Sequence, residues 1–198
     1  VTRGLRKAEF VLKNARIVNV FTREILEGDI AIQDGMIVGI GNYQGEEETD
    51  LGGRYVCPGF IDSHLHLEST LVTPAELVTV ASRHGTTTFI VDPHESANVS
   101  GLKGIDYILN QTEDVDANVF VMMPSCVPAT AIDDNGCTLT AQDMEPYLSK
   151  KRILGLGEVM DYISVVKGDE AMHRKLELFS DKVRDGHAPF LSDMDLQA

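Results

Sequence analysis

The stretch that decides the fold is Pro58-Gly59-Phe60-Ile61-Asp62-Ser63-His64-Leu65-His66-Leu67-Glu68-Ser69-Thr70. An apolar pair, Phe60-Ile61, leads into two histidines that are separated by one leucine. If this segment is a strand, His64 and His66 point to the same face and lie about 7 Å apart along it. Two imidazoles at this spacing can bind one cation, and neutral imidazole suits Zn, Fe, Mn or Ni. The same pattern also fits two polar residues at a strand end that bind no metal.

From Cys57 onward the sequence alternates short β-rich runs with helical stretches, a pattern that predicts βαβ units and a parallel sheet. Histidines at strand ends favour a (β/α) barrel over a doubly wound sheet, because such barrels keep their chemistry at the carboxyl ends of the strands. The expected strands are Phe60–Leu67, Thr87–Asp92, Val119–Met123, Ile153–Glu158 and Ala188–Leu191. The expected helices are one that begins at Thr73-Pro74, then Gly101–Gln111, Ala141–Lys150 and Asp169–Val183.

Residues 1–56 have a different character and predict the N-terminal part of a small β-sandwich module. Asp34-Gly35 lies between two β-rich runs, which is a strong hairpin signal. The acidic segment Gln44–Asp50 is interpreted as a solvated turn or linker. The fold class predicted for the chain is therefore α/β, a partial (β/α)8 barrel of the TIM type preceded by a small all-β module.

The length of the chain limits how much of a barrel it can hold. A complete (β/α)8 barrel takes roughly 250 residues, whereas residues 57–198 carry signals for about five βα units. We therefore expect this chain to be an N-terminal portion of a larger, truncated barrel. A partial barrel exposes two sheet edges, which another segment or another copy has to cover. We expect a homo-oligomer for this reason.

Composition excludes several classes of partner. The net charge is −14 with histidine neutral, which argues against a nucleic-acid backbone or an anionic membrane surface as partner. No apolar run is long enough to span a bilayer. The three cysteines have unrelated spacings, so neither a disulfide framework nor a zinc knuckle is expected, and this usage fits a reducing cytoplasm.

Six stretches together resemble the adenine deaminase family of the amidohydrolase superfamily. The His-x-His of the opening stretch alone is typical of the superfamily, and the order of the others makes the resemblance specific. It runs from about Ala8 to the end of the chain. The further stretches are Glu68-Ser69-Thr70, Gly85-Thr86-Thr87-Thr88, Asp92-Pro93-His94-Glu95, Gly157-Glu158-Val159-Met160-Asp161 and Asp185-Gly186-His187-Ala188-Pro189.

The resemblance implies a metal-dependent hydrolase whose ligands are His64, His66, Glu158 and His187. It implies two divalent ions, Mn, Fe or Zn, that are bridged by the Glu158 carboxylate. Each ligand also has a plainer interpretation, which is a strand-end salt bridge for Glu158 and a helix C-cap for His187. The residues expected to contact the substrate or to support the ligands are Asp62, Asp92, His94 and Glu95.

The activity that the resemblance implies is hydrolysis of adenine, a small-molecule substrate, to hypoxanthine and ammonia in purine salvage. The family's proton-shuttling aspartate and a further histidine ligand are expected beyond Ala198, so we expect this portion to be inactive alone. Two alternatives stay open. One is a cyclic-amide hydrolase of the same superfamily that resembles dihydropyrimidinase, and the other is a folded fragment without catalysis. Glu158 at the fourth strand, where a bridging lysine would be needed, weighs against the cyclic-amide hydrolase.

Overall fold

A computed structural model describes residues 1–130 and 132–197. Its contacts divide the chain into two compact units, Val1–Pro58 and the part from Gly59 onward. The division falls two residues past the end that the sequence predicts for the β module. The two units are described separately below.

The first unit is a five-stranded sheet of order β3-β2-β1-β4, in which β5 also pairs with β1. The β2–β3 hairpin turns at Asp34-Gly35, where both residues have positive φ, so the predicted hairpin is confirmed. Gln44–Asp50 was expected to be a turn, and this expectation is wrong: its residues from Gly45 form an edge strand parallel to β1. Edge strands tolerate exposed acidic side chains because only the backbone pairs. The strands are β1 (Ala8–Asn19), β2 (Glu24–Gln33), β3 (Met36–Gly41), β4 (Gly45–Asp50) and β5 (Tyr55–Val56).

The buried carboxylate of Asp29 accepts hydrogen bonds at the register shift between β1 and β2. The pairing of β1 with β2 shifts between Leu12 and Ala15, and Asp29 lies opposite the shift. Its Oδ2 accepts from Lys13 Nζ at 2.6 Å and from Tyr43 N at 3.1 Å, and its Oδ1 accepts from Asn14 N at 3.0 Å. Burial alone would raise the pKa of Asp29, but these three donors lower it below its ordinary value of 3.8.

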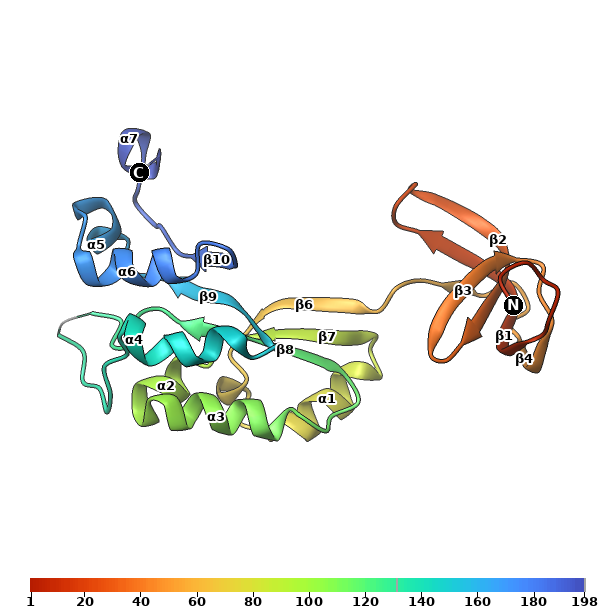
Figure 1. Cartoon of the computed structure of the whole chain (residues 1–198), viewed down its shortest axis with the longest axis horizontal. Coiled ribbons are helices and arrows are strands. Elements are labelled where there is room, and N and C mark those ends of the chain that lie inside the picture. The colour runs from red at the N-terminus through yellow and green to blue at the C-terminus, as the bar shows by residue number, and fades with distance from the viewer. Residues whose placement is uncertain (131, 198) are drawn as a thin grey trace. The chain divides into compact units, whose positions relative to one another are not determined.

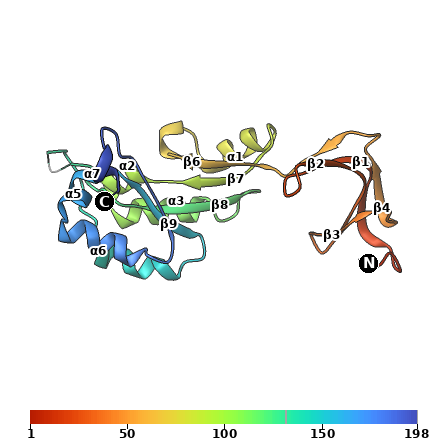
Figure 2. The ribbon, with the colours of Figure 1, turned by 90° about the horizontal axis from the view of Figure 1, so that it is seen from above.

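The second unit is a curved parallel sheet of order β10-β9-β8-β7-β6. Figures 1 and 2 show these strands side by side, and α1 packs against β7. The strands are β6 (Phe60–Leu65), β7 (Thr86–Val91), β8 (Asn118–Pro124), β9 (Ile153–Val159) and β10 (Val183–Gly186). The helices are α1 (Pro74–Ser82), α2 (His94–Ser100), α3 (Leu102–Gln111), α4 (Ala141–Met144), α5 (Tyr162–Lys167), α6 (Glu170–Leu178) and α7 (Asp193–Gln197).

Apolar side chains of the central strands and of the helices form one core. Val91, Val121 and Leu156 are fully buried on β7, β8 and β9, and they pack with Ile105 of α3 and with Phe179. Burying each of these side chains contributes roughly 1.5–3 kcal/mol of transfer free energy. This core fixes the relative positions of the strand ends that carry the polar side chains.

The parallel sheet with intervening helices confirms the α/β class and the partial barrel, but several predicted element boundaries are wrong. The fifth strand is Val183–Gly186 and not Ala188–Leu191, because Pro189 has no N–H to donate to a sheet ladder. The helix predicted over Asp169–Val183 ends at Leu178, and the chain turns at the buried Phe179 so that Val183 pairs with Gly155.

The helix predicted over Ala141–Lys150 is also shorter than expected. The α-helix stops at Met144, and Glu145–Ser149 continues as a 3-10 helix. Pro146 explains the change, because it lacks the N–H that would continue the α-helical ladder. Glu68–Thr70 forms a second short 3-10 helix after β6.

We expect Asp29→Ala to lower the unfolding free energy of the first unit by about 1–3 kcal/mol, because it leaves three donors without their acceptor. Hydrogen exchange over residues 8–50 measures this unit separately. Because the folded pKa of Asp29 is lowered, its contribution is complete above the unfolded value of 3.8 and is lost as pH falls below it. The difference from wild type should therefore shrink below about pH 4. Equal loss from the control Glu46→Ala, an exposed side chain, would contradict the assignment.

Candidate metal centre

Titratable side chains of β6, β9 and β10 meet at the carboxyl ends of the parallel sheet. His64 is in β6, and His66 follows the end of that strand. Glu158 is in β9, and His187 follows β10 directly. Parallel strands place their carboxyl ends at one edge, so these residues lie together despite more than 100 intervening positions.

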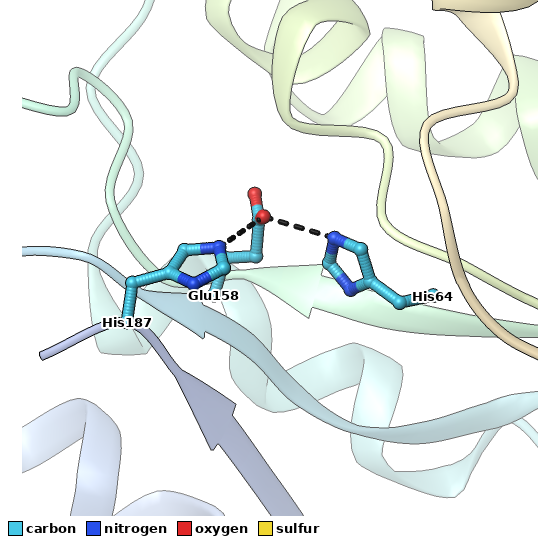
Figure 3. Close-up of side chains that lie close together, drawn as sticks. All are labelled: His64, Glu158 and His187. Carbon is cyan, nitrogen blue, oxygen red and sulfur yellow. Dashed lines mark hydrogen bonds and ion pairs between the residues drawn. The ribbon is translucent and has the colours of Figure 1, made fainter.

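The Glu158 carboxylate is the centre of this group. Its Oε1 lies 2.6 Å from His187 Nε2, 2.9 Å from His64 Nε2 and 3.2 Å from His66 Nε2. Figure 3 shows His64 and His187 on opposite sides of the carboxylate, both with a ring nitrogen directed toward the same oxygen. Only about 7% of the Glu158 side chain is exposed. A single buried oxygen therefore contacts three imidazoles.

A backbone contact sets the orientation of His66. Its Nδ1 lies 2.8 Å from the carbonyl oxygen of Asp92, so Nδ1 carries the proton in that contact and Nε2 remains free as a donor of electrons. The Nε2 atom is the one that faces Glu158 and lies 3.2 Å from His64 Nε2. A metal-binding histidine is commonly oriented in this way by a carbonyl at its other ring nitrogen.

Asp92 and His94 form a second, deeper group around the other oxygen of Glu158. His94 Nδ1 lies 3.3 Å from Glu158 Oε2 and 2.5 Å from Asp92 Oδ1. Both residues are buried, yet neither carboxylate oxygen of Asp92 and neither ring nitrogen of His94 has a well-aligned hydrogen bond among the described residues. Buried polar atoms without hydrogen bonds are costly in a folded protein. A cation would satisfy them.

The charges of the group are mutually dependent. Burial raises the pKa of Glu158, but the hydrogen bond from His187 and the charges of the other histidines outweigh this and lower it. Burial lowers the pKa of His66, but the carboxylates of Glu158 and Glu95 raise it above its ordinary value. Burial dominates at Asp92 and raises the pKa of its carboxyl. The pKa values of these three side chains are thus set by two effects, partial burial and the close approach of carboxylates and imidazoles.

The donor set fits divalent cations. Two groups have ligand atoms within 4.8 Å of one another, His64 with Glu158 and His187, and Asp92 with His94 and Glu158. Donors around a tetrahedral ion with bonds of about 2.1 Å lie about 3.4 Å apart, close to several of the separations given above. Glu158 belongs to both groups, and its two oxygens face different ones. The site thus offers imidazole and carboxylate donors in an arrangement that suits divalent cations.

The other residues expected near the site have distinct places. Asp62 Oδ1 accepts from the backbone N–H of His64 at 3.3 Å, so it contacts the chain and not the imidazole. Glu95 lies at the start of α2, half exposed, with Oε2 3.4 Å from His66 Nδ1. The structure therefore brings all eight predicted residues to one strand-end region, with His94 and Asp92 buried and Glu95 at its surface.

Two residues next to the site, Asp185 and Ser125, were not predicted from the sequence as site residues. Asp185 Oδ2 lies 3.7 Å from His64 Nδ1, and Ser125 binds the backbone of Glu158 through its hydroxyl at 2.8 Å. Asp185 precedes Gly186-His187, so its position beside a candidate ligand was the available signal. Ser125 follows a strand of apolar residues and has no distinguishing pattern.

Comparisons with known proteins agree with this arrangement. The sequence profile of the amidohydrolase family matches residues 55–189. The chain is 62% identical over 195 residues to adenine deaminase of Desulfitobacterium hafniense and 47% identical over 197 residues to adenine deaminase of Clostridium acetobutylicum. Each match covers 98% of this chain but only 34% and 35% of those proteins. The chain therefore spans about a third of the length of the curated relatives it matches.

Solved structures show the same fold at low sequence identity. A β-aspartyl dipeptidase from Fervidobacterium islandicum superposes with a TM-score of 0.56 at 15% identity, covering 89% of this chain and 50% of that one. An atrazine chlorohydrolase from Arthrobacter aurescens, solved with zinc, gives a TM-score of 0.52 at 16% identity and covers 70% of this chain and 41% of that one. Among the described residues, no helix has the length and apolar character needed to cross a bilayer.

We expect the chain to bind Zn²⁺ or Mn²⁺. Glu158→Gln or His64→Asn should lower the affinity more than about 100-fold, because each removes a ligand, and loss of a group that only supports a ligand already costs about 10–100-fold. Metal at 100 times its Kd should raise the unfolding free energy by about 2.7 kcal/mol, and a chelator should reverse the change. Calorimetric titration and thermal unfolding measure both effects. His84→Asn, an exposed histidine after α1, is the matched control, and an equal loss there would contradict the site.

Gly157→Ala should destabilise the unit by about 1–3 kcal/mol through overpacking. A Cβ at Gly157 would overlap Asp92 Oδ2 and lie 2.8 Å from Met122 Cβ, so Asp92 would have to move. In an Asp92→Ala background the same substitution should cost measurably less, and a double-mutant cycle in urea gives the coupling. Additive effects would show that the two residues do not compete for this space.

Proposed function

The chain belongs to the amidohydrolase family, and we propose that it is the N-terminal portion of an enzyme that hydrolyses adenine to hypoxanthine and ammonia. The observation that supports the proposal most is the Glu158 carboxylate, which is surrounded by histidines of three strand ends, those of β6, β7 and β10. Its support from relatives is that proteins named adenine deaminase match 98% of the chain. Since those matches cover about a third of each relative, the activity of the whole protein is part of the proposal.

The side chains of this portion would hold a pair of divalent ions. His64, His66 and His187 would hold one ion and Asp92 with His94 a deeper one, and the Glu158 carboxylate lies within reach of both groups. Bound divalent ions lower the pKa of water from about 15.7 to about 7, which supplies a hydroxide nucleophile near neutral pH. The low pKa of Glu158 keeps its carboxylate charged and ready to bind.

Further contacts would position these ligands or the base. Asp92 orients His66 through its backbone carbonyl at 2.8 Å, and Asp62 holds the backbone of His64. Glu95 has the exposure and the position to accept a hydrogen bond from a purine N–H, since more than half of its side chain is open to solvent. We therefore assign substrate contact to Glu95.

We also propose which metals suit the site, in which compartment the protein works and how it assembles. Histidine and carboxylate donors suit Zn, Mn and Fe alike, and the related atrazine chlorohydrolase structure contains zinc. Three free cysteines, one of them exposed, suit a reducing cytoplasm. A homo-oligomer in which copies cover open sheet edges stays a prediction.

Proton transfer from water to the leaving amine requires a group placed at both. The resemblance to the adenine deaminase family implies that this group is an aspartate. It also implies that the aspartate and one further histidine ligand belong to later strands of the barrel. We therefore propose that residues 1–198 alone bind metal without turning over adenine. A cyclic-amide hydrolase is the second candidate, and Glu158 in place of a lysine on β9 disfavours it.

A chimera tests the activity. We expect the chain to support ammonia release from adenine when it replaces the matching third of the Desulfitobacterium hafniense adenine deaminase. The same chimera with His64→Asn should lose at least about 100-fold in kcat/KM, because His64 is a candidate metal ligand. The chimera with His84→Asn should keep its activity, because His84 is not one of the candidate ligands. Ammonia is measured against adenine, hydantoin and dihydrouracil. A folded, metal-loaded chimera that hydrolyses dihydrouracil and leaves adenine intact would replace the proposal by the second candidate.

A further inference from the structure

Glu158 has an unusual backbone for a residue in a strand. Its φ is +30°, in the left-handed region that residues with a side chain rarely adopt. It is the second-last residue of β9, and the pairing of β9 with β10 shifts register beside it, between Arg184 and Gly186. Such a conformation persists only where the surroundings over-determine it. The contacts on both sides of the strand end therefore matter.

Ser125 holds this backbone from the β8 side with two hydrogen bonds. Its N–H donates to Gly157 O at 3.3 Å, and its hydroxyl donates to Glu158 O at 2.8 Å. The hydroxyl also lies 3.1 Å from Cys126 Sγ, a weaker acceptor than a carbonyl. Ser125 is fully buried, so water does not compete for these bonds.

A buried lysine fixes Ser125 in turn. Lys175 of α6 donates from Nζ to the carbonyl oxygen of Ser125 at 2.6 Å, and only 8% of the residue is exposed. Burial lowers the pKa of Lys175, against the opposing effect of Cys126 and nearby carboxylates. Burying an ammonium group in this position is costly. The carbonyl to which Lys175 donates belongs to Ser125, the residue that binds the backbone of Glu158.

We propose that Ser125 is a positioning residue that sets the metal affinity by holding Glu158 in its left-handed backbone conformation, with Lys175 as its support. The inference rests on the proposed metal-binding function. Without the Ser125 hydroxyl, the Glu158 peptide relaxes toward ordinary strand geometry. The carboxylate then turns away from His64, His66 and His187. On the β10 side the pairing of Gly186 with Val159 and the His187 N–H, which donates to Val159 O at 3.2 Å, would still hold the residue after Glu158.

The test is the affinity of the 198-residue chain for Zn²⁺ and for Mn²⁺, measured by competition with a chromophoric chelator. Ser125→Ala should weaken binding by about 10–100-fold, the range for groups that support metal ligands. Ser125→Thr, which keeps the hydroxyl, should restore affinity to within a few-fold of wild type. Ser164→Ala is the matched control, because its hydroxyl is also hydrogen-bonded, to Asp161 Oδ2 at 2.6 Å, and makes no hydrogen bond to Glu158 among the described residues.

Thermal unfolding of the metal-free variants separates positioning from a purely structural role. We expect Ser125→Ala and Ser164→Ala to melt at similar temperatures and to differ only in metal affinity. If Ser125→Ala fails to fold, Lys175→Met provides the test, since it leaves the hydroxyl in place and should weaken binding several-fold. Wild-type affinity in a folded Ser125→Ala or Lys175→Met chain would overturn the inference.

Two reference chains distinguish failure of this inference from failure of the proposed function. If wild type binds metal, Glu158→Gln loses it and Ser125→Ala keeps it, only the positioning role is wrong. If wild type binds neither Zn²⁺ nor Mn²⁺, the metal centre itself is wrong and the positioning role fails with it. A loss shared by Ser125→Ala and Glu158→Gln, with Ser164→Ala unchanged, supports both.

Discussion

The contact on which the site depends is that of one carboxylate oxygen, Glu158 Oε1, with the Nε2 atoms of three histidines. These histidines come from strand ends at the two edges of the sheet, β6 and β10, while Glu158 lies on β9 between them. No short segment of the chain could bring them together. The order of the parallel strands and their shared curvature do so, with the core of β7, β8 and β9 keeping the strand ends in place.

Burying this carboxylate requires compensation by charge. A buried charge that loses its partner costs several kcal/mol, whereas a paired one can be close to neutral in free energy. Here the histidines lower the pKa of Glu158, while Asp92 lies deep enough for burial to raise its pKa. The unsatisfied atoms of Asp92 and His94 mark the place where compensation by protein groups is incomplete. Such atoms without hydrogen bonds are the ones that a cation could bind.

The parts of this arrangement that follow local rules could be predicted from the sequence. Strand alternation places His64 and His66 on one face, and Thr73-Pro74 gives the start of α1, where the Thr73 hydroxyl accepts from Glu76 N. The fold class followed from the alternation of elements. The candidate ligands Glu158 and His187 needed, in addition, the resemblance to a family.

The rest depends on contacts that no local pattern encodes. β4 is a strand because its backbone pairs with β1, although its acidic side chains are typical of a solvated turn. Ser125 matters only because the fold places it beside Gly157 and Glu158, 32 and 33 residues further along the chain. The positive φ of Glu158 is likewise set by neighbours on other strands and not by its own sequence.

We propose that Glu158 holds cations through both of its oxygens. Anomalous diffraction from crystals of the chain grown with Mn²⁺, and separately with Zn²⁺, can show this. We expect anomalous peaks about 2.0–2.2 Å from the Glu158 carboxylate oxygens, with imidazole nitrogens of His64 or His187 in the same coordination sphere. Strong peaks elsewhere, with the Glu158 carboxylate still bonded only to protonated histidines, would contradict it.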